Sequence, residues 1–374
     1  MALFAGLLLA AEALGTSGVR KVSARAADPS FDSRGTSERM LRFLRERFSI
    51  PDNVKMSLGA FHAAPLPEFY TTTLTLSEGK ETKTQDLSVT RDGHYMLQGS
   101  IIRLASSGGS AGDGLDAKIS QTIREHFKVP EALRVDVGPL RESKLRGFQA
   151  TTISVGDGIQ KQVQEFLVSK DNQYLVQGNL YNLLGDPRLE VIRSISLEDR
   201  PYQGGARAPV MIVEYADLEC PMCARVHQFL EKELAPKYGN KVKVVFKEFP
   251  LVQIHDWSLT AAIGTQCAYA MNPSTFLPLR GMIFENQSML KAANIRDMLL
   301  TYAERVGLDR EKFAECLDSK ATLPRVEQDL TEGQRLGVAS TPTCFINGKP
   351  FVGLPSPEAF YKAVDEALAQ KGLK

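Results

Sequence analysis

The sequence predicts two tandem α+β modules followed by a larger α/β domain with a helical insertion. Three observations lead to this prediction: an internal repeat in the first half, a C-x-x-C pair between a strand pattern and a helix pattern, and the confinement of all five cysteines to the second half. The length of 374 residues, at roughly 150 residues per domain, also favours two or three domains.

The composition excludes two broad classes of protein. Hydrophobic residues make up 43% of the chain and charged residues 24%, which is typical of globular domains and excludes global disorder. The 45 Lys and Arg residues balance 44 Asp and Glu residues, so the formal net charge is +1 and no strong field favours nucleic acid or anionic lipid. We therefore expect a local site to carry the function, with no nucleic-acid partner.

Residues 1–27 are predicted to be a signal peptide. An apolar run from Ala2 to Leu14 is interrupted only by Glu12, and Ala24 and Ala26 provide the small side chains that a signal peptidase reads. No Lys or Arg precedes the run, which is atypical, and a disordered leader is the alternative. Because no later segment is long and apolar enough to cross a membrane, the mature protein is expected to be exported, periplasmic and soluble.

An offset of 79 residues aligns the first half of the chain with itself. Sixteen identities fall in sixty positions, so residues 38–105 recur in a second module at residues 117–200. Each module opens with a helical pattern that ends before Pro51 or Pro130, and strand patterns follow, with turn signals at Asp92 and Asn172. Neither module contains a cysteine or a cluster with metal-ligand spacing, so chemistry is not expected there.

Two segments have the composition of linkers. Residues 106–114 (SSGGSAGDG) form a flexible joint between the modules, and residues 199–208 (DRPYQGGARA) lead into the C-terminal domain at 205–374.

The C-terminal domain begins with a strand–helix–strand pattern. Residues 210–215 and 242–249 are apolar strand patterns, and between them a helical pattern begins at Cys220-Pro221-Met222-Cys223. Cys220 at the helix cap is exposed to unpaired N–H groups and the positive end of the helix dipole, which stabilise a thiolate. Cys220 is therefore the predicted nucleophile, and Cys223, one turn later, the resolving cysteine. The alternatives are a structural disulfide or half of a zinc site, although no second ligand pair has matching spacing.

A second motif, Ser340-Thr341-Pro342-Thr343, is followed by an apolar strand and a turn at residues 347–349, and its Pro342 lies 122 residues after Cys220. Together the two motifs resemble the thioredoxin superfamily, and the spacing resembles the DsbA-like bacterial disulfide oxidoreductases, with a helical insertion at about 257–336. The resemblance implies that Pro342 is a cis-proline against the active-site sulfurs and that Thr341 offers its backbone to an extended substrate peptide. Pro221 and Met222 are expected beside the same substrate.

By the same resemblance, Glu214 matches the buried acid that relays the proton of the second cysteine; a carboxylate exposed at a sheet edge is the alternative. Lys247 could face Glu214, but a solvated strand lysine is the simpler interpretation. DsbA has a histidine at the position of Met222, so this site is expected to be less oxidising than DsbA.

The modules resemble a second family over a shorter stretch. Residues 171–181 (DNQYLVQGNLY) are similar to a strand–turn–strand segment of the N-terminal dimerisation domain of the DsbC and DsbG disulfide isomerases, and residues 91–101 are a weaker match. This resemblance implies cystatin-like modules and a homodimer, or an internal pair within one chain. An unrelated α+β module is the alternative.

These observations predict an exported thiol–disulfide oxidoreductase or isomerase that needs no cofactor besides the Cys220/Cys223 disulfide and holds no metal. Isomerase or oxidase is favoured over reductase; the expected partners are cysteine-containing secreted clients and a membrane thiol oxidase or reductase. The alternative from another class is an envelope chaperone or substrate-binding protein with a non-catalytic thioredoxin-like domain. Among the remaining cysteines, Cys267 and Cys316 are expected to form a disulfide and Cys344 to be a buried thiol, with three unpaired thiols as the alternative.

Overall fold

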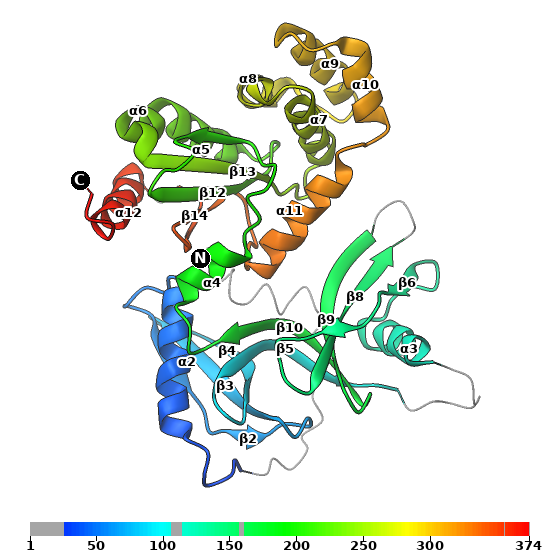
Figure 1. The fold of residues 1–374 in the computed structure, drawn as a ribbon, viewed down its shortest axis with the longest axis vertical. Helices are drawn as coiled ribbons and strands as arrows, with labels where there is room; N and C mark the ends of the chain where they lie inside the picture. Colours follow the sequence, from blue (N-terminus) through cyan, green and yellow to red (C-terminus); the bar gives the residue numbers. More distant parts are fainter. Residues whose placement is uncertain (1–25, 106–113, 157–160, 355, 374) are drawn as a thin grey trace. The chain divides into compact units, whose positions relative to one another are not determined.

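The computed structural model describes residues 26–105, 114–156, 161–354 and 356–373. The chain forms two compact units, of which one contains mainly residues up to 187 and the other mainly residues from 188 onward (Figure 1). The predicted signal peptide and nearly all of the predicted joint at 106–114 lie outside the described residues.

The N-terminal unit contains the same order of elements twice, a helix followed by five strands. The first set is α2 (Ser33–Arg47), β1 (Lys55–Leu58), β2 (His62–Ala63), β3 (Phe69–Glu78), β4 (Glu81–Thr90) and β5 (Tyr95–Arg103). The second set is α3 (Leu115–Phe127), β6 (Arg134–Val137), β7 (Arg141–Glu142), β8 (Phe148–Gly156), β9 (Lys161–Ser169) and β10 (Tyr174–Asn182). The short strands β1, β2, β6 and β7 were not predicted.

The ten strands form one sheet whose second half mirrors the first. The order is β1-β3-β4-β5-β10-β9-β8-β6, with β2 beside β3 and β7 beside β8. At its centre β5 and β10 pair antiparallel from Tyr95 opposite Asn182 to Arg103 opposite Tyr174. Gly99 faces Gly178, its own counterpart at the offset of 79 residues.

The hairpin turns between these strands follow from their sequences. Gly93 adopts a positive φ of 68° and Asn172 one of 55°, a conformation that glycine and asparagine tolerate best. In each turn an Asp side chain accepts the backbone N–H two residues later, Asp92 from His94 at 2.9 Å and Asp171 from Gln173 at 3.0 Å.

The central strand pairing makes Gly99 intolerant of any side chain. A Cβ atom at Gly99 would overlap the carbonyl oxygen of Gln177, so Gly99→Ala must push β5 away from β10. We expect a cost of about 2 kcal/mol, seen as roughly tenfold or faster hydrogen exchange of the β5 and β10 amides. Gly59→Ala is the control, because the nearest atom to its Cβ would be 3.7 Å away; equal exchange rates in the two variants would contradict the expectation.

The C-terminal unit combines a five-stranded sheet with helices. Its strands are β11 (Tyr202–Gly204), β12 (Val210–Ala216), β13 (Val242–Glu248), β14 (Thr343–Ile346) and β15 (Lys349–Val352). Its helices are α4 (Pro187–Ser194), α5 (Pro221–Phe229), α6 (Ala235–Tyr238), α7 (Ser258–Met271), α8 (Phe276–Glu285), α9 (Ile295–Arg305), α10 (Arg310–Asp318), α11 (Leu323–Arg335) and α12 (Pro357–Ala369). A π-helical segment, Leu230–Leu234, joins α5 to α6.

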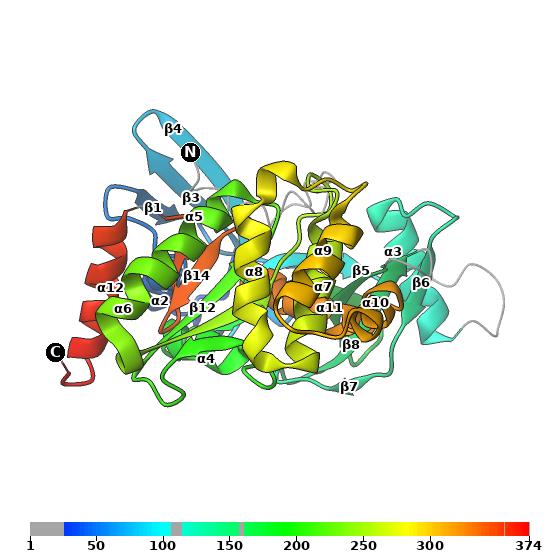
Figure 2. The ribbon, with the colours of Figure 1, turned by 90° about the horizontal axis from the view of Figure 1, so that it is seen from above.

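The strand order is β11-β13-β12-β14-β15, with β12 and β13 parallel and β14 antiparallel to β12. One face of this sheet packs against α5 and α12 through residues such as Ile212, Phe229 and Phe360. The other face packs against α4 and the end of α11 through residues such as Tyr215, Val191 and Leu336. In the view of Figure 2, α5 and α6 lie next to β12 and β14, and α12 lies beside α6 at the left edge.

The structure corrects two predictions about the segment that leads into this unit. Residues 188–200 were assigned to the second module, but Val191 and Ile195 are buried against the C-terminal sheet. The linker predicted at 199–208 contains β11, which pairs with β13, and the buried Arg200, whose Nε donates to Asp329 at 2.8 Å. Composition alone does not reveal either feature, because the residues that bury this segment are distant in the sequence. The Asp329 partner of Arg200, for example, lies 129 positions away.

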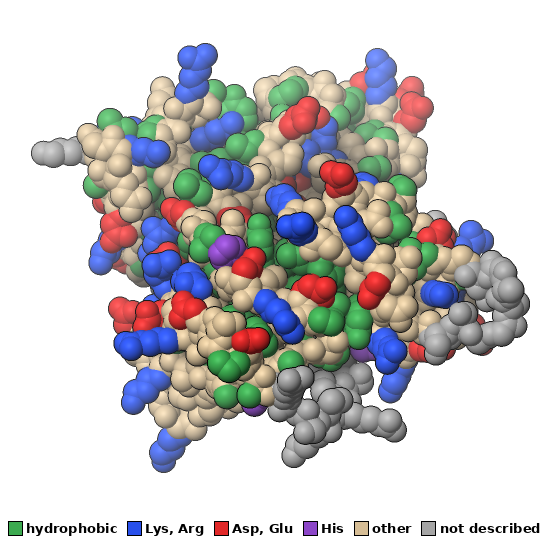
Figure 3. All heavy atoms as spheres, turned by 60° about the horizontal axis from the view of Figure 1, so that its bottom comes forward, with side chains coloured by type: hydrophobic (Ala, Val, Ile, Leu, Met, Phe, Trp, Pro, Cys, Tyr) green, Lys and Arg blue, Asp and Glu red, His purple; other side chains and the backbone are tan. Residues whose placement is uncertain are grey.

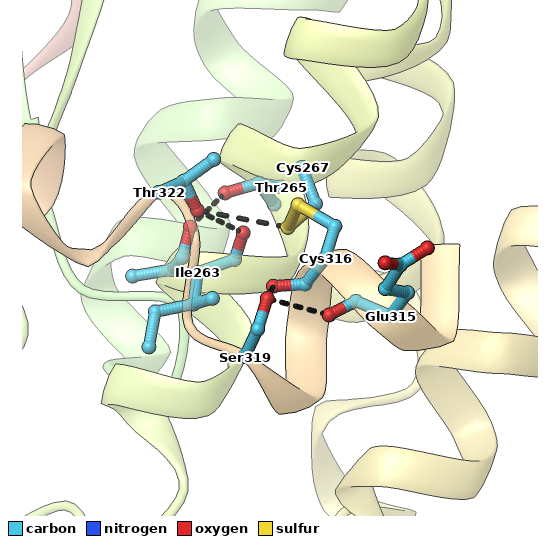
Figure 4. The surroundings of a disulfide bond; sticks show 8 residues. Ile263, Thr265, Cys267, Glu315, Cys316, Ser319 and Thr322 are labelled. Carbon is cyan, nitrogen blue, oxygen red and sulfur yellow. Dashed lines mark hydrogen bonds between the residues drawn. A yellow bond between two sulfur atoms is a disulfide. The ribbon is translucent and has the colours of Figure 1, made fainter. Parts of the chain in front are cut away.

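Helices α7 to α11 form the insertion predicted at about 257–336. A disulfide joins Cys267 on α7 to Cys316 on α10 (Figure 4). Next to it, the Thr322 hydroxyl donates to the carbonyl oxygen of Ile263 at 3.0 Å. These contacts hold the loop after α10 against α7.

Two further features of the described residues are the distribution of charge on the surface and the hydropathy of the helices. On the face drawn in Figure 3, acidic and basic side chains are interspersed, as the balanced composition leads one to expect. Within the described ranges, none of the helices combines the length and the hydropathy needed to cross a bilayer.

Candidate functional site

The C-x-x-C pair lies where β12 ends and α5 begins. Cys220 is the N-cap residue of α5 with extended backbone (φ −73°, ψ 121°), and Pro221 occupies the first turn, where its missing N–H costs nothing. The Cys220 carbonyl accepts the N–H groups of Cys223 at 3.0 Å and Ala224 at 3.3 Å, which begins the helix. Both cysteines are free thiols in the structure.

The surroundings of Cys220 favour its thiolate. Cys220 is 9% exposed. A hydrogen bond from the Cys223 thiol lowers the pKa of Cys220 to about 5, and the backbone N–H groups of Cys223 and Met222 act in the same direction. Cys220 is therefore largely ionised at neutral pH when reduced.

Cys223 has the opposite character. Its side chain is fully buried, and burial, together with the neighbouring Cys220 and the charge of Glu214, raises the pKa of its thiol. The backbone N–H of Asp217 donates to its sulfur at 3.4 Å. The motif thus contains one ionised thiol, which keeps a small exposed surface, and one neutral thiol, which is fully buried.

The loop before β14 completes the site. The Thr341–Pro342 peptide bond is cis, and the Cys220 thiol, when protonated, donates to the carbonyl oxygen of Thr341 at 3.5 Å. The Thr341 hydroxyl oxygen is buried without a hydrogen-bond partner among the described residues. The structure therefore brings Thr341 and Pro342 to Cys220 from 121 residues away in the sequence.

Two polar side chains that the sequence analysis missed hold the active-site loop. The Gln287 amide donates to the carbonyl oxygens of Leu218 at 2.7 Å and Cys220 at 3.1 Å. The buried Asp217 carboxylate accepts the backbone N–H of Leu251 at 2.7 Å and pairs with His255 Nδ1 at 2.8 Å. No sequence signal marks these residues, because their partners lie 34 to 69 positions away.

Glu214 is fully buried, and burial raises the pKa of its carboxyl group. Its Oε2 atom pairs with Nη2 of Arg280 on α8 at 2.8 Å, and Arg280 is itself 2% exposed. Arg280 could have been found from the sequence, because it is the single charge inside the apolar stretch FLPLRGMIF. A lone arginine in such a stretch indicates a buried partner.

The prediction that Lys247 is solvated is wrong, and it does not face Glu214. Lys247 is 1% exposed, and its ammonium pairs with Asp329 at 2.9 Å and Glu332 at 2.8 Å on α11. In the register of β12 and β13, Lys247 is opposite Tyr215, which lies on the other face of the sheet from Glu214.

The remaining predicted residues lie as follows. Met222 is 37% exposed and lies beside Cys220 in the first turn of α5. Cys344 is fully buried on β14, where its register partner is Glu214. Among the residues with assigned structure, no group of three or more His, Cys, Asp or Glu side chains could hold a metal ion.

Comparison with known proteins agrees with this geometry. Residues 196–366 match the family model described as thioredoxin. The C-terminal half has a thioredoxin fold. The predicted fold class, a thioredoxin fold with a helical insertion after a helix-and-sheet N-terminal region, is confirmed.

The curated relatives match less than half of this chain. The Na(+)/H(+) antiporter NhaA 3 of Salinispora tropica is 34% identical over 177 residues, which cover 47% of this chain and 26% of the antiporter. An antiporter NhaA of Herminiimonas arsenicoxydans is 32% identical over 168 residues, 45% of this chain and 24% of that protein. The chain thus spans about a quarter of the length of these relatives.

Solved structures that resemble the chain include BdbD from Bacillus subtilis, with a TM-score of 0.44, 22% identity, and coverage of 46% of this chain and 95% of that one. The thiol-disulfide exchange protein α-DsbA2 from Wolbachia pipientis has a TM-score of 0.42 and 21% identity, and covers 48% of this chain and 92% of that one.

Proposed function

We propose that the protein is an exported, periplasmic thiol–disulfide oxidoreductase that forms, reduces or rearranges disulfides in secreted proteins. The observation that carries the proposal is the contrast within one motif, since Cys220 has a lowered pKa of about 5 at a helix N-terminus and Cys223 a raised one. A Cys220 thiolate attacks a client disulfide, and Cys223 then attacks Cys220 and releases the client thiol.

The neighbouring groups support specific roles in that cycle. Pro342 would press against the Cys220 sulfur, because the cis Thr341–Pro342 bond lies beside it, and Thr341 and Met222 would contact an extended client segment. Glu214 would accept the proton of Cys223, since its charge already acts on that thiol. A membrane thiol oxidase or reductase would reset the motif, and the disulfide itself serves as the redox group, without a further cofactor.

The N-terminal modules would hold clients near the catalytic unit. We favour an internal pair over a homodimer, because β5 and β10 already occupy each other's hydrogen-bonding edge. Light scattering of the intact protein should then give the mass of one chain. The mass of two chains would show that the modules also dimerise.

Reduction of insulin in the presence of dithiothreitol tests the activity. The full chain should accelerate the reaction and Cys220→Ser should return it to the uncatalysed rate. A full chain no faster than Cys220→Ser would instead favour a binding protein or chaperone whose cysteine pair is not catalytic.

Met222→His should make the motif more oxidising. A protonated imidazole beside Cys220 stabilises the thiolate and hence the reduced form. We expect the equilibrium with glutathione to shift towards the reduced protein by roughly tenfold, about 30 mV. Met222→Gln is the uncharged control, and equal potentials in both variants would show that residue 222 points away from the sulfur.

A further inference from the structure

The layer between the C-terminal sheet and its helices contains two buried carboxylates and one guanidinium. Glu214 on β12 is 0% exposed, Glu248 on β13 3% and Arg280 on α8 2%. Strands β12 and β13 are parallel neighbours, with Glu214 opposite Phe246 and Ala216 opposite Glu248, so both glutamates point to the same face. Helices α5 and α8 lie side by side (Figure 2), so the helix that carries Arg280 is next to the helix that begins at the C-x-x-C motif.

Each of the two glutamates has only a few hydrogen-bond donors around its buried carboxylate. Glu214 Oε2 pairs with Arg280 Nη2 at 2.8 Å. Glu248 Oε1 accepts the Thr265 hydroxyl at 2.8 Å and the Gln266 amide at 3.0 Å. Burial raises the pKa of Glu248 to about 7, and the charge of Arg280 acts against that rise. Arg280 is thus a counter-ion for both acids.

Three polar atoms of this cluster are buried without a hydrogen-bond partner: Glu214 Oε1, Gln266 Oε1 and Arg280 Nη1. Two of them, the glutamate and glutamine oxygens, are acceptors that lack a donor. A carboxyl proton would supply one donor at this place. The hydrogen-bond pattern therefore agrees with one protonated acid in the cluster.

The other titratable groups that face the cluster add no positive charge. Burial and the charge of Arg280 lower the pKa of His227 on α5 to about 3, so its imidazole is neutral. Burial raises the pKa of the thiols of Cys223 on α5 and Cys344 on β14, so both are neutral. Asp329 adds a negative charge near Glu248, and the cations beside Asp329, Arg200 and Lys247, already pair with Asp329 itself. With both glutamates ionised, one negative charge would lack a counter-ion.

We propose that Glu214 and Glu248 share one proton at neutral pH, with Arg280 as their common counter-ion, and that this pair exchanges its proton with Cys223. When Cys223 resolves a mixed disulfide, its thiol proton passes to the ionised member of the pair. The Cys223 thiolate then attacks Cys220, the Cys220–Cys223 bond forms, and the client sulfur leaves as a thiolate. In the reverse direction the proton returns to Cys223 as the client thiolate attacks Cys220 and opens the disulfide. Glu248 and Arg280 act through Glu214 and are positioning residues.

Infrared difference spectra between acidic and neutral pH test the shared proton directly. The full-length oxidised protein should show the carbonyl stretch of one protonated buried carboxyl group at neutral pH. Glu248→Gln preserves the acceptor for Thr265 and Gln266 and leaves one acid opposite Arg280, so the band should vanish. Glu214→Gln should abolish it as well. A band that is missing in the natural protein, or that survives in either variant, would overturn the proposal.

Glu332→Gln is the matched control, because Glu332 is a largely buried carboxylate that pairs with Lys247, on the other face of the sheet. It should leave the band unchanged, and thermal melts should confirm that all three variants are folded. A loss of the band in Glu332→Gln as well would show a general effect of buried carboxylates and contradict the assignment.

The role towards Cys223 rests on the proposed function, whereas the infrared band does not. The pH profile of the resolving step in single-turnover reoxidation should shift to lower pH by a unit or more in Glu248→Gln, because Glu214 becomes permanently ionised. An unchanged profile alongside a lost band would refute the proton exchange with Cys223 while the shared proton stands.

Discussion

Cys223→Ala should accumulate mixed disulfides with client proteins, and Cys220→Ala should accumulate none. Without Cys223, the adduct between Cys220 and a client has no neighbouring thiol to resolve it, so it persists. Mass spectrometry after an acid quench should find roughly tenfold or more adduct in Cys223→Ala than in the natural protein. The adduct should map to Cys220.

Cys344→Ala is the matched control for this trapping experiment. Cys344 is a free thiol in the same domain, but it is fully buried on β14 and outside the motif. It should trap no client and leave the exchange rate unchanged. Equal trapping by Cys223→Ala and Cys220→Ala would refute the assignment of nucleophile and resolving residue.

Removal of the N-terminal unit should separate two activities. Isomerisation needs a client that stays bound through repeated exchange, whereas reduction of a small disulfide needs only an accessible Cys220. A fragment of residues 188–374 should therefore reduce small disulfides within about twofold of the full chain but lose roughly tenfold in refolding a scrambled client. Assays with a small disulfide and a scrambled multi-disulfide client measure the two rates.

The first residue of the fragment matters for this experiment. A start at residue 201 would remove Val191 and Ile195 from the core and Arg200 from its buried pair with Asp329. Breaking a buried pair costs about 3 kcal/mol or more, so that shorter fragment would lose stability as well as the modules. The 188–374 fragment with residues 26–187 added as a separate chain is the control for tethering. If the fragment alone refolds the client as well as the full chain, the modules serve another purpose.

The sequence was sufficient for features that depend on local patterns. Cys220 and Pro221 mark a helix start because cap preferences and an N-terminal proline are local signals. The repeat is visible as identical residues 79 positions apart, and turns such as Asp92-Gly93 follow from backbone preferences. The separation of 122 residues between Cys220 and Pro342 in the sequence also predicted a helical insertion.

The features that the sequence did not reveal depend on contacts between distant residues. Lys247 has an ordinary place in a strand pattern, and only the position of α11 shows that Asp329 and Glu332 neutralise it. Gln287 is an unremarkable polar residue until the fold brings it to the carbonyl oxygen of Cys220. Burial of polar groups is decided by such partners, which periodicity does not encode.

The pH dependence of alkylation of the fully reduced protein tests the central claim most directly. Peptide mass mapping follows each cysteine separately, so Cys220 and Cys223 report on their own ionisation. We predict that Cys220 reacts with a midpoint near pH 5, as its lowered pKa requires, while Cys223 and Cys344 stay unmodified at neutral pH. A Cys220 midpoint near the usual thiol value of about 8.5, or modification of Cys223 at the same pH, would contradict the account.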